Sequence, residues 1–274
     1  MKIRILLPAL LIIVCLPASY SQDNSRGGNY VPQIGQQGKD VVWVPTPQVL
    51  VDTMLSMAKV NSNDFVIDLG SGDGRTVISA AKRGARALGV EYNPDMVALS
   101  RQNAGEAGVS GLTEFKQGDL FECDLSGATV ITLFLLPDIN LKLRPKLLDL
   151  KPGTRIVSNT FTMGDWEPDR EVSIDENWSS WSTALLWIVP AKVEGKWKIG
   201  EDLLNLSQDF QMVKGTLTSG NKVNKLTNGK LRGDEIIFRI GNDLYRGNVI
   251  GDSITGVCRN DVEGHVEDFI AKKL

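Results

Sequence analysis

An α/β domain with helices on both faces of a mainly parallel sheet, followed by a small antiparallel β domain, is the fold class that this sequence of 274 residues predicts. Two patterns support the prediction. Between residues 65 and 160, short apolar runs alternate with segments of helical spacing, as in doubly wound sheets. From about residue 193, runs of four to eight residues are separated by glycine and asparagine, which is typical of an antiparallel meander.

The elements of the first domain follow one another in a regular order. The expected strands are 65–69, 86–91, 113–117, 128–136 and 154–160, and the expected helices are 75–83, 94–107 and 138–149. Before the first strand, apolar residues at helical spacing in 41–60 accompany Pro45 and Pro47 and predict a further helix. A strand near 181–190 is expected to complete the sheet as its antiparallel edge.

The chain is expected to have four parts. These are a signal peptide at 1–21, a flexible lead-in at 22–40, the α/β domain at 41–192 and an all-β domain at 193–274. The lead-in is rich in Gly, Gln and Asn and has few large apolar residues. The last part is predicted to form a β-sandwich or half-barrel. Its role is open between substrate docking, dimerisation and structural capping, and the oligomeric state is open too.

A glycine-rich turn follows the first strand of the α/β domain. The sequence VIDLGSGDGR at 66–75 places Asp68 near the end of the strand and three glycines in the turn. Glycine permits a sharp turn and the close approach of a ligand, and such a turn presents free N–H groups where it opens a helix. Arg75 stands where a dinucleotide fingerprint has its third glycine, so we expect no pyrophosphate site.

Two further acids stand at the ends of the next strands. Glu91 closes the second strand, where an acid is placed to hold the hydroxyls of a ribose. Asp119 follows the third strand, where it can accept a hydrogen bond from an adenine amino group. Asp68 is placed to accept one from an ammonium group. A site for a nucleoside and an ammonium group, without a diphosphate, suits S-adenosylmethionine.

Three segments carry a family resemblance. VIDLGSGDGR, LGVEYNPDMV and KQGDLFECDL resemble, in order and spacing, the nucleoside-binding segments of class I S-adenosylmethionine-dependent methyltransferases, which have a Rossmann-like sheet. With VPTPQ at 44–48 and RPKLLDLKPGTRIVS at 144–158, the chain resembles one subgroup in particular. It includes bacterial relatives of the mitochondrial protein-lysine methyltransferases of the ATP synthase c subunit and the adenine nucleotide translocase. The resemblance covers about residues 40–190 and implies S-adenosyl-L-methionine as cofactor and a protein lysine as acceptor.

The motifs together give a set of expected cofactor contacts. The residues are Thr46, Gln48, Asp68, Gly70, Ser71, Gly72, Asp73, Gly74, Glu91, Tyr92, Asn93, Asp119 and Leu120. Thr46 and Gln48 are included because the resemblance places the VPTPQ segment beside the site. Capping of the following helix is the alternative role for Thr46.

Two acids are candidates for orienting the acceptor. Transfer of a methyl group from a sulfonium requires alignment of the nucleophile and no covalent catalyst. Asp138 ends the sequence Leu-Leu-Pro-Asp, where enzymes that methylate bases often carry Asn/Asp-Pro-Pro-aromatic. It is expected either to orient an ammonium group or to cap the next helix. Asp165 and Trp166, after the fifth strand, are expected in an acceptor channel, with surface packing of Trp166 as the alternative.

Composition argues against several classes of function. The formal net charge is −3 and no basic cluster is present, so nucleic acid is not expected as a partner. His265 is the one histidine of the chain, and no metal-binding spacing accompanies it. Cys123 and Cys258 are expected as separate thiols. A small-molecule methyltransferase, or an exported ligand-binding module without turnover, remain the alternative functions.

The first 21 residues have the layout of a secretory signal. Lys2 and Arg4 precede an apolar run at 5–16, and Ser19 and Ser21 stand before a cleavage site. The run is too short for a stable membrane span, which needs about 20 residues. We therefore expect a periplasmic or envelope-associated protein, with an uncleaved membrane anchor as the alternative.

Overall fold

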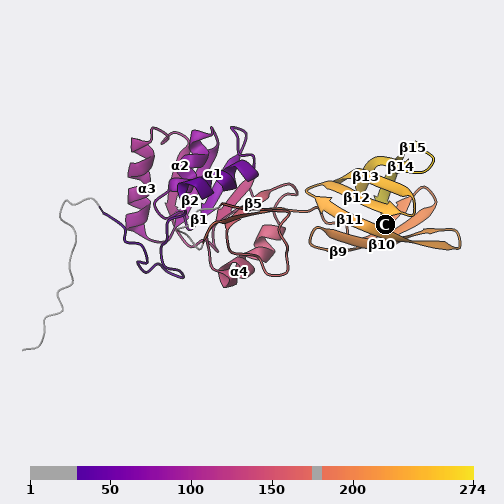
Figure 1. Ribbon diagram of the computed structural model, residues 1–274, viewed down its shortest axis with the longest axis horizontal. Coiled ribbons are helices and arrows are strands. Elements are labelled where there is room, and N and C mark those ends of the chain that lie inside the picture. Colours follow the sequence, from indigo (N-terminus) through magenta and orange to yellow (C-terminus); the bar gives the residue numbers. More distant parts are fainter. Residues whose placement is uncertain (1–29, 175–180) are drawn as a thin grey trace, which may run out of the picture. The chain divides into compact units, whose positions relative to one another are not determined.

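The computed structural model describes residues 30–174 and 181–274, and residues 32–274 form one compact unit. The expected signal peptide and most of the expected lead-in lie outside the described residues. Within these residues, an α/β sheet is followed along the chain by an antiparallel β-barrel (Figure 1). The predicted fold class is therefore confirmed.

A seven-stranded sheet forms the first domain, with the strand order β3-β2-β1-β4-β5-β7-β6. The strands are β1 (Phe65–Leu69), β2 (Arg86–Glu91), β3 (Thr113–Gln117), β4 (Val130–Leu133), β5 (Arg155–Asn159), β6 (Arg170–Ser173) and β7 (Thr183–Ile188). β1 to β5 are parallel, whereas β7 runs antiparallel to both β5 and β6. The carboxyl ends of β1 to β5 consequently meet at one edge of the sheet.

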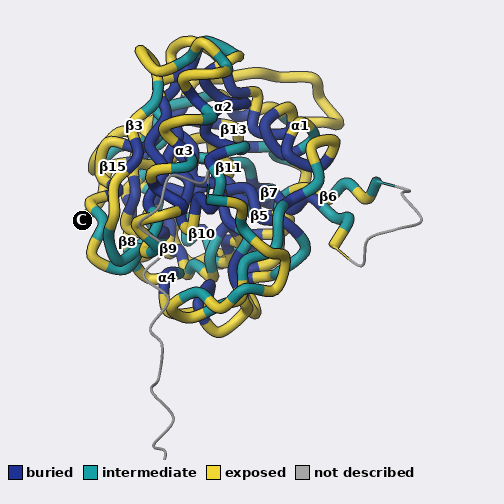
Figure 2. Tube along the Cα trace, turned by 90° about the vertical axis from the view of Figure 1, so that its left-hand side faces the viewer, coloured by how far each residue is buried: buried dark blue, intermediate teal, exposed yellow. Residues whose placement is uncertain are grey.

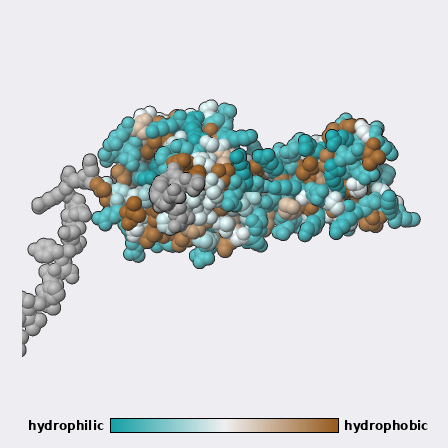
Figure 3. All heavy atoms as spheres, in the orientation of Figure 1, coloured by the Kyte–Doolittle hydropathy of each residue, from teal (hydrophilic) through white to brown (hydrophobic). Residues whose placement is uncertain are grey.

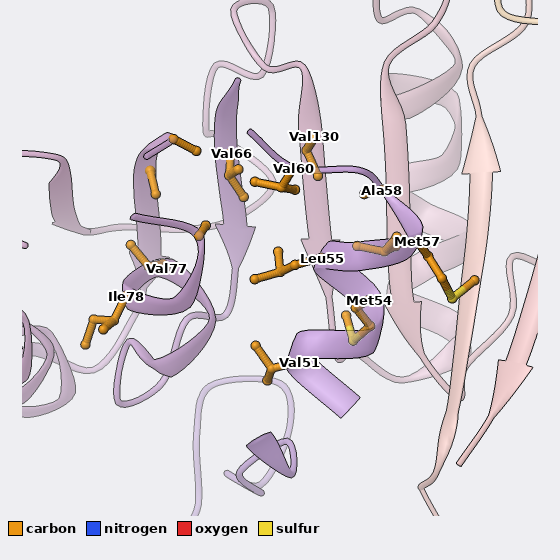
Figure 4. Packing of buried hydrophobic residues seen from close by; sticks show 14 of the residues in the cluster. Val51, Met54, Leu55, Met57, Ala58, Val60, Val66, Val77, Ile78 and Val130 are labelled. Carbon is orange, nitrogen blue, oxygen red and sulfur yellow. The ribbon is translucent and has the colours of Figure 1, made fainter. Parts of the chain in front are cut away.

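Helices cover both faces of this sheet. They are α1 (Gln48–Met57), α2 (Arg75–Lys82), α3 (Pro94–Glu106) and α4 (Pro137–Leu148). α1, α2 and α3 share one buried cluster with alternate strand residues such as Val66 and Val130, as Figure 4 shows for α1 and α2. α4 packs with the intervening residues, among them Ile67 and Ile131. Burial of strand side chains on both faces explains the continuous apolar runs seen in the sequence.

One strand differs from the expectation. The segment expected at 181–190 is present as β7, but it is not the edge of the sheet, because β6 pairs with its outer side. β5 and β7 are buried along most of their length (Figure 2), whereas β6 is largely exposed. A four-residue strand of sequence REVS carries neither the apolar run nor the alternation that would reveal it.

The second domain is a closed barrel of eight antiparallel strands. They are β8 (Gly195–Ile199), β9 (Asp202–Asp209), β10 (Met212–Ser219), β11 (Lys222–Arg232), β12 (Glu235–Ile240), β13 (Asp243–Ile250), β14 (Ser253–Asn260) and β15 (Val266–Lys273). Closure comes from the pairing of β15 with β8, in which Lys273 lies opposite Trp197. The sequence predicted the antiparallel meander correctly. It indicated a sandwich or half-barrel, whereas the structure has a closed barrel.

The strands of a small barrel bend strongly and bring neighbouring backbones close together. Two positions have room only for glycine. A Cβ on Gly215 would lie 2.1 Å from the carbonyl oxygen of Asn205, and one on Gly256 would lie 2.0 Å from that of Arg246. The interior is filled by side chains, including Trp197. On the surface shown in Figure 3, hydrophobic side chains are interspersed with hydrophilic ones in both domains.

The barrel and the sheet are joined by direct contacts within the compact unit. Trp166 is fully buried and stacks on Phe210 of the β9–β10 turn, with ring centroids 5.9 Å apart. The Trp187 Nε1 donates a hydrogen bond of 2.7 Å to the Trp166 carbonyl. Lys230 pairs with Asp169 at 3.1 Å. Trp166 therefore lies at the barrel and not in an acceptor channel, which corrects its expected role.

Candidate active site

A pocket opens at the carboxyl ends of β1 to β5. Its lining comes from the turns after these strands, from residues 36–46 and from Trp181 just before β7. This is where ligands bind in open α/β sheets. The cofactor residues expected from the sequence line it together, with the exceptions of Gln48 and Gly74.

The glycine turn is held open for a ligand by its backbone. Gly70, Gly72 and Gly74 have φ angles of +79°, +54° and +82°, which side chains rarely allow. A Cβ on Gly72 would lie 2.5 Å from the Trp43 Nε1, and one on Gly74 would lie 2.8 Å from the Phe115 ring. These glycines are therefore required both for the turn and for close packing.

The Glu91 carboxylate is fixed by two backbone N–H groups. Gly72 donates to one of its oxygens at 3.0 Å, and Asn93 donates to the other at 2.9 Å. The Asn93 side chain in turn caps α3 by accepting from the Asp95 N–H at 2.9 Å. Because each carboxylate oxygen has a second lone pair, Glu91 can still accept hydrogen bonds from a pair of ligand hydroxyls.

Asp68 is buried beneath the glycine turn, and no cationic side chain among the described residues pairs with it. Burial raises its pKa from 3.8 to about 7, the hydrogen bond from the Thr132 hydroxyl opposes the rise, and the charges of Glu91 and Asp73 add to it. The Thr132 Oγ1 lies 2.5 Å from the carboxylate. A ligand ammonium beside Asp68 would favour its ionised form.

Ser71 adds a second buried polar group to the pocket. Its hydroxyl is buried, lines the pocket and has no hydrogen-bond partner among the described residues. Buried polar atoms are rarely left unpaired, so this hydroxyl is suited to a ligand atom. The buried carboxylate, the buried hydroxyl and the fixed Glu91 fit the ammonium and ribose groups of S-adenosylmethionine.

An ion pair connects the glycine turn to the segment before α1. Arg75 pairs with Asp73 at 2.6 Å, and its other guanidinium nitrogen donates to the Thr46 carbonyl at 2.9 Å. Thr46 lines the pocket and does not cap α1, whose N-cap is Pro47. Gln48 instead donates to the Ser79 hydroxyl at 2.9 Å, outside the pocket lining.

Residues 35–43 form a short turn over the pocket. Gly35 donates to the Trp43 carbonyl at 2.8 Å, and Trp43 donates to the Gln36 carbonyl at 2.9 Å. The flexible lead-in expected at 22–40 therefore does not extend over the whole range. This hydrogen-bonded turn was missed because its composition is polar and glycine-rich.

Asp119 is engaged by this turn. Lys39 pairs with one carboxylate oxygen at 2.5 Å and lies 5.0 Å from the centre of the Tyr92 ring. The Phe121 N–H donates to the other oxygen at 2.9 Å. The hydrogen bond from Lys39 holds the pKa of Asp119 below its ordinary value. An adenine amino group would have to share or replace Lys39 at this carboxylate.

The two expected acceptor acids do not line the pocket. Asp138 is exposed in the first turn of α4, whose N-cap is Leu136, so Asp138 is not the cap either. Asp165 is 79% exposed at its side chain and pairs with Arg144. That hydrogen bond holds the pKa of Asp165 below its ordinary value. The position of each acid after a strand correctly places it at the carboxyl edge of the sheet. It does not predict whether the side chain points into the pocket.

We refer to the part of the pocket at β4, β5 and β7 as its acceptor half, and aromatic residues line it. Phe134 follows β4, Phe161 follows β5, and Trp181 precedes β7. The sequence pattern indicated the acids Asp138 and Asp165 as candidates and did not indicate these rings. The only available signal was an aromatic residue beside each strand end, which is too common to identify a site.

Within the described residues, no group of three or more His, Cys, Asp or Glu side chains could hold a metal ion. Both cysteines in the described part of the chain are free thiols. None of the helices in these ranges has the length and apolar character needed to cross a membrane.

Comparison with known proteins identifies relatives of the first domain. Residues 68–170 match the family model for the ANTKMT methyltransferase domain. A protein-lysine N-methyltransferase of Saccharolobus islandicus is 42% identical over 151 residues, which are 54% of this chain and 89% of the relative. In Mus musculus, the lysine N-methyltransferase of the ATP synthase c subunit is 36% identical over 140 residues, 50% of this chain. The chain spans 56% of the length of this mouse relative.

One solved structure is also similar. It is described as an RNA methyltransferase from Salinibacter ruber in complex with S-adenosyl-L-homocysteine. The two proteins are 52% identical, and the match covers 55% of this chain and 96% of that one with a TM-score of 0.52. Its bound S-adenosylhomocysteine agrees with the ligand groups that Asp68, Ser71 and Glu91 fit.

Proposed function

Because the chain belongs to the class I S-adenosylmethionine-dependent methyltransferases related to the lysine N-methyltransferases of the ATP synthase c subunit, we propose that it methylates a lysine side chain of a protein. Lysine is proposed as the acceptor because the chain is 42% identical to the archaeal protein-lysine N-methyltransferase and covers 89% of it. The pocket supports it, because its acceptor half is apolar and holds no carboxylate among the described residues that line it.

The cofactor residues would bind and orient S-adenosylmethionine. Asp68 would bind the ammonium group of the amino acid moiety, Glu91 the ribose hydroxyls and Asp119 the adenine amino group. Bound S-adenosylmethionine supplies an electrophilic methyl group on a sulfonium. Each charged hydrogen bond of this kind contributes roughly 1.5–3 kcal/mol.

The acceptor nitrogen must lose its proton before it attacks the methyl group. Desolvation lowers the pKa of an ammonium group, and the aromatic walls of the acceptor half provide it. We propose that this proton leaves for solvent before water is excluded, because neither Asp138 nor Asp165 lines the pocket to accept it. The role of the protein in this half is to align the nitrogen lone pair with the methyl group and to exclude water.

RNA is the second candidate acceptor, and the description of the Salinibacter ruber structure favours it. The formal charge of −3 argues against it, because RNA binding depends largely on neutralising phosphates. A small-molecule acceptor is the remaining enzymatic alternative.

Radiolabelled S-adenosylmethionine distinguishes these acceptors. Extract from the source organism is incubated with the protein, and portions are then treated with protease or with ribonuclease. We expect label that is lost on protease treatment and kept after ribonuclease. A Glu91→Ala variant, in which cofactor binding is weakened, serves as the control and is used with S-adenosylmethionine below saturation. Label that is lost only with ribonuclease would favour RNA as the acceptor.

We also propose that residues 1–21 direct export of the protein. The basic start, the short apolar run and the small residues before Gln22 support this. Cell fractionation with N-terminal sequencing tests it. A protein that starts at Gln22 in the periplasmic fraction agrees with export, and a full-length protein in the cytosol contradicts it.

A further inference from the structure

We propose that Phe134, Phe161 and Trp181 form an aromatic acceptor subsite that binds the substrate as an alkylammonium cation. The inference rests on the proposed lysine methylation and names the residues that would select the side chain. We refer to these three residues as the aromatic subsite.

The three rings pack against one another in one part of the pocket. The Phe134 and Phe161 rings are stacked with centroids 5.9 Å apart and an interplanar angle of 18°. The Trp181 ring meets Phe134 edge-on, with centroids 6.0 Å apart and an angle of 65°. All three residues line the pocket, so the cluster is a wall of the site and not part of the core.

The strand order separates this subsite from the nucleoside. The acids that fit the cofactor stand at the carboxyl ends of β1, β2 and β3, which form one half of the sheet edge. The aromatic residues stand at β4, β5 and β7 in the other half. The methyl acceptor must therefore approach the cofactor past the rings.

The backbone directly before Phe161, at Thr160, has an uncommon conformation. Thr160 has a φ of +59°, and the Phe161 N–H donates to the Asn159 carbonyl at 2.6 Å. The Phe161 carbonyl accepts from the Ser158 hydroxyl at 2.8 Å and from the Asn140 amide at 3.3 Å. Strain of this kind persists where surrounding contacts fix it, and it occurs preferentially at functional sites.

The chemistry of the lining selects a cation. Among the described residues, the acids that line the pocket are Asp40, Asp68, Asp73, Glu91 and Asp119, and none of them follows β4 or β5. Of the described residues, those that a cation meets in this half are therefore aromatic side chains and not carboxylates. Aromatic faces attract ammonium and methylammonium groups, most strongly when water is excluded. The same faces could stack a nucleobase, which is the competing occupant.

A pair of probes of equal shape tests the charge preference. Choline and its uncharged isostere 3,3-dimethylbutan-1-ol are titrated into the full-length protein saturated with S-adenosylhomocysteine. We expect choline to bind roughly threefold to thirtyfold more tightly, the range that a cation–π interaction provides. Phe134→Leu and Phe161→Leu should each reduce this preference while S-adenosylhomocysteine still binds, which shows that the variants are folded.

Phe210→Leu is the matched control, because Phe210 stacks on Trp166 outside the pocket. It should keep the preference for choline. Equal affinity for the two probes, or equal losses in Phe161→Leu and Phe210→Leu, would overturn the aromatic subsite. Binding of cytidine in place of choline would overturn it in favour of a base. Label that enters only RNA in the extract experiment would overturn the proposed function, whatever the result with choline.

Discussion

Replacement of Asp68 by asparagine is expected to stabilise the cofactor-free protein and to weaken cofactor binding. Asp68 is buried, its pKa is raised to about 7, and the Thr132 hydroxyl is its hydrogen-bond donor. In the unfolded chain the carboxyl titrates near its ordinary value of 3.8. Between these values the folded state holds a proton that the unfolded state has lost, so stability falls as the pH rises from about 4 to about 7.

The size of the effect follows from the two pKa values. Each pH unit in the window corresponds to about 1.36 kcal/mol, so the free energy of unfolding loses on the order of 4 kcal/mol by pH 8.5. Asparagine has no charge to bury and retains an oxygen that accepts from Thr132. Asp68→Asn should therefore be close to the wild type in stability near pH 4 and more stable by several kcal/mol at pH 8.5.

Urea denaturation of the cofactor-free proteins at the two pH values measures this difference. Calorimetry at pH 8.5 should show that Asp68→Asn binds S-adenosylmethionine roughly tenfold to a hundredfold more weakly, because a charged hydrogen bond is lost. In the wild type the affinity should rise with pH up to about 7, as Asp68 ionises. Parallel pH profiles of stability, with unchanged cofactor affinity, would refute the reasoning.

Three other changes test separate parts of the site. Glu91→Ala should weaken S-adenosylhomocysteine binding roughly tenfold or more in calorimetry, because Glu91 orders the glycine turn and faces the ribose; a smaller change would argue against that role. Lys39→Met should raise affinity for the same ligand by up to about fivefold, since it frees Asp119; weaker binding would show that Lys39 itself contacts the ligand. Asp138→Asn should leave kcat within about twofold in a methyl-transfer assay, because Asp138 is exposed outside the pocket lining; a large loss would return it to the acceptor site.

Local chemistry made the cofactor half of the site predictable. The glycine turn, Glu91 and the capping residue Asn93 each depend on a few neighbouring residues and on the end of one strand. Parallel strands bring these ends to the same edge, so their order in the sequence was enough to group them.

The acceptor half of the site could not be predicted from the sequence, because it depends on contacts between residues that are far apart in the chain. Asp165 turns outward because Arg144, on α4, holds it. The aromatic subsite combines residues from three separate strand ends, and no local pattern marks their convergence. Barrel closure likewise depends on the pairing of Lys273 with Trp197, which are far apart in the sequence. The turn over the pocket was hidden because backbone hydrogen bonds, and not apolar side chains, hold it.

The most direct test of the central claim is mass spectrometry after methyl transfer from S-adenosylmethionine that carries a deuterated methyl group. The protein and its Glu91→Ala variant are each incubated with extract, and the peptides and nucleosides are analysed from the same reaction. We predict deuterated methyl groups on lysine residues of a small number of proteins, abundant with the wild type and strongly reduced with the variant. Label confined to nucleosides, or equal lysine labelling with both proteins, would contradict the account.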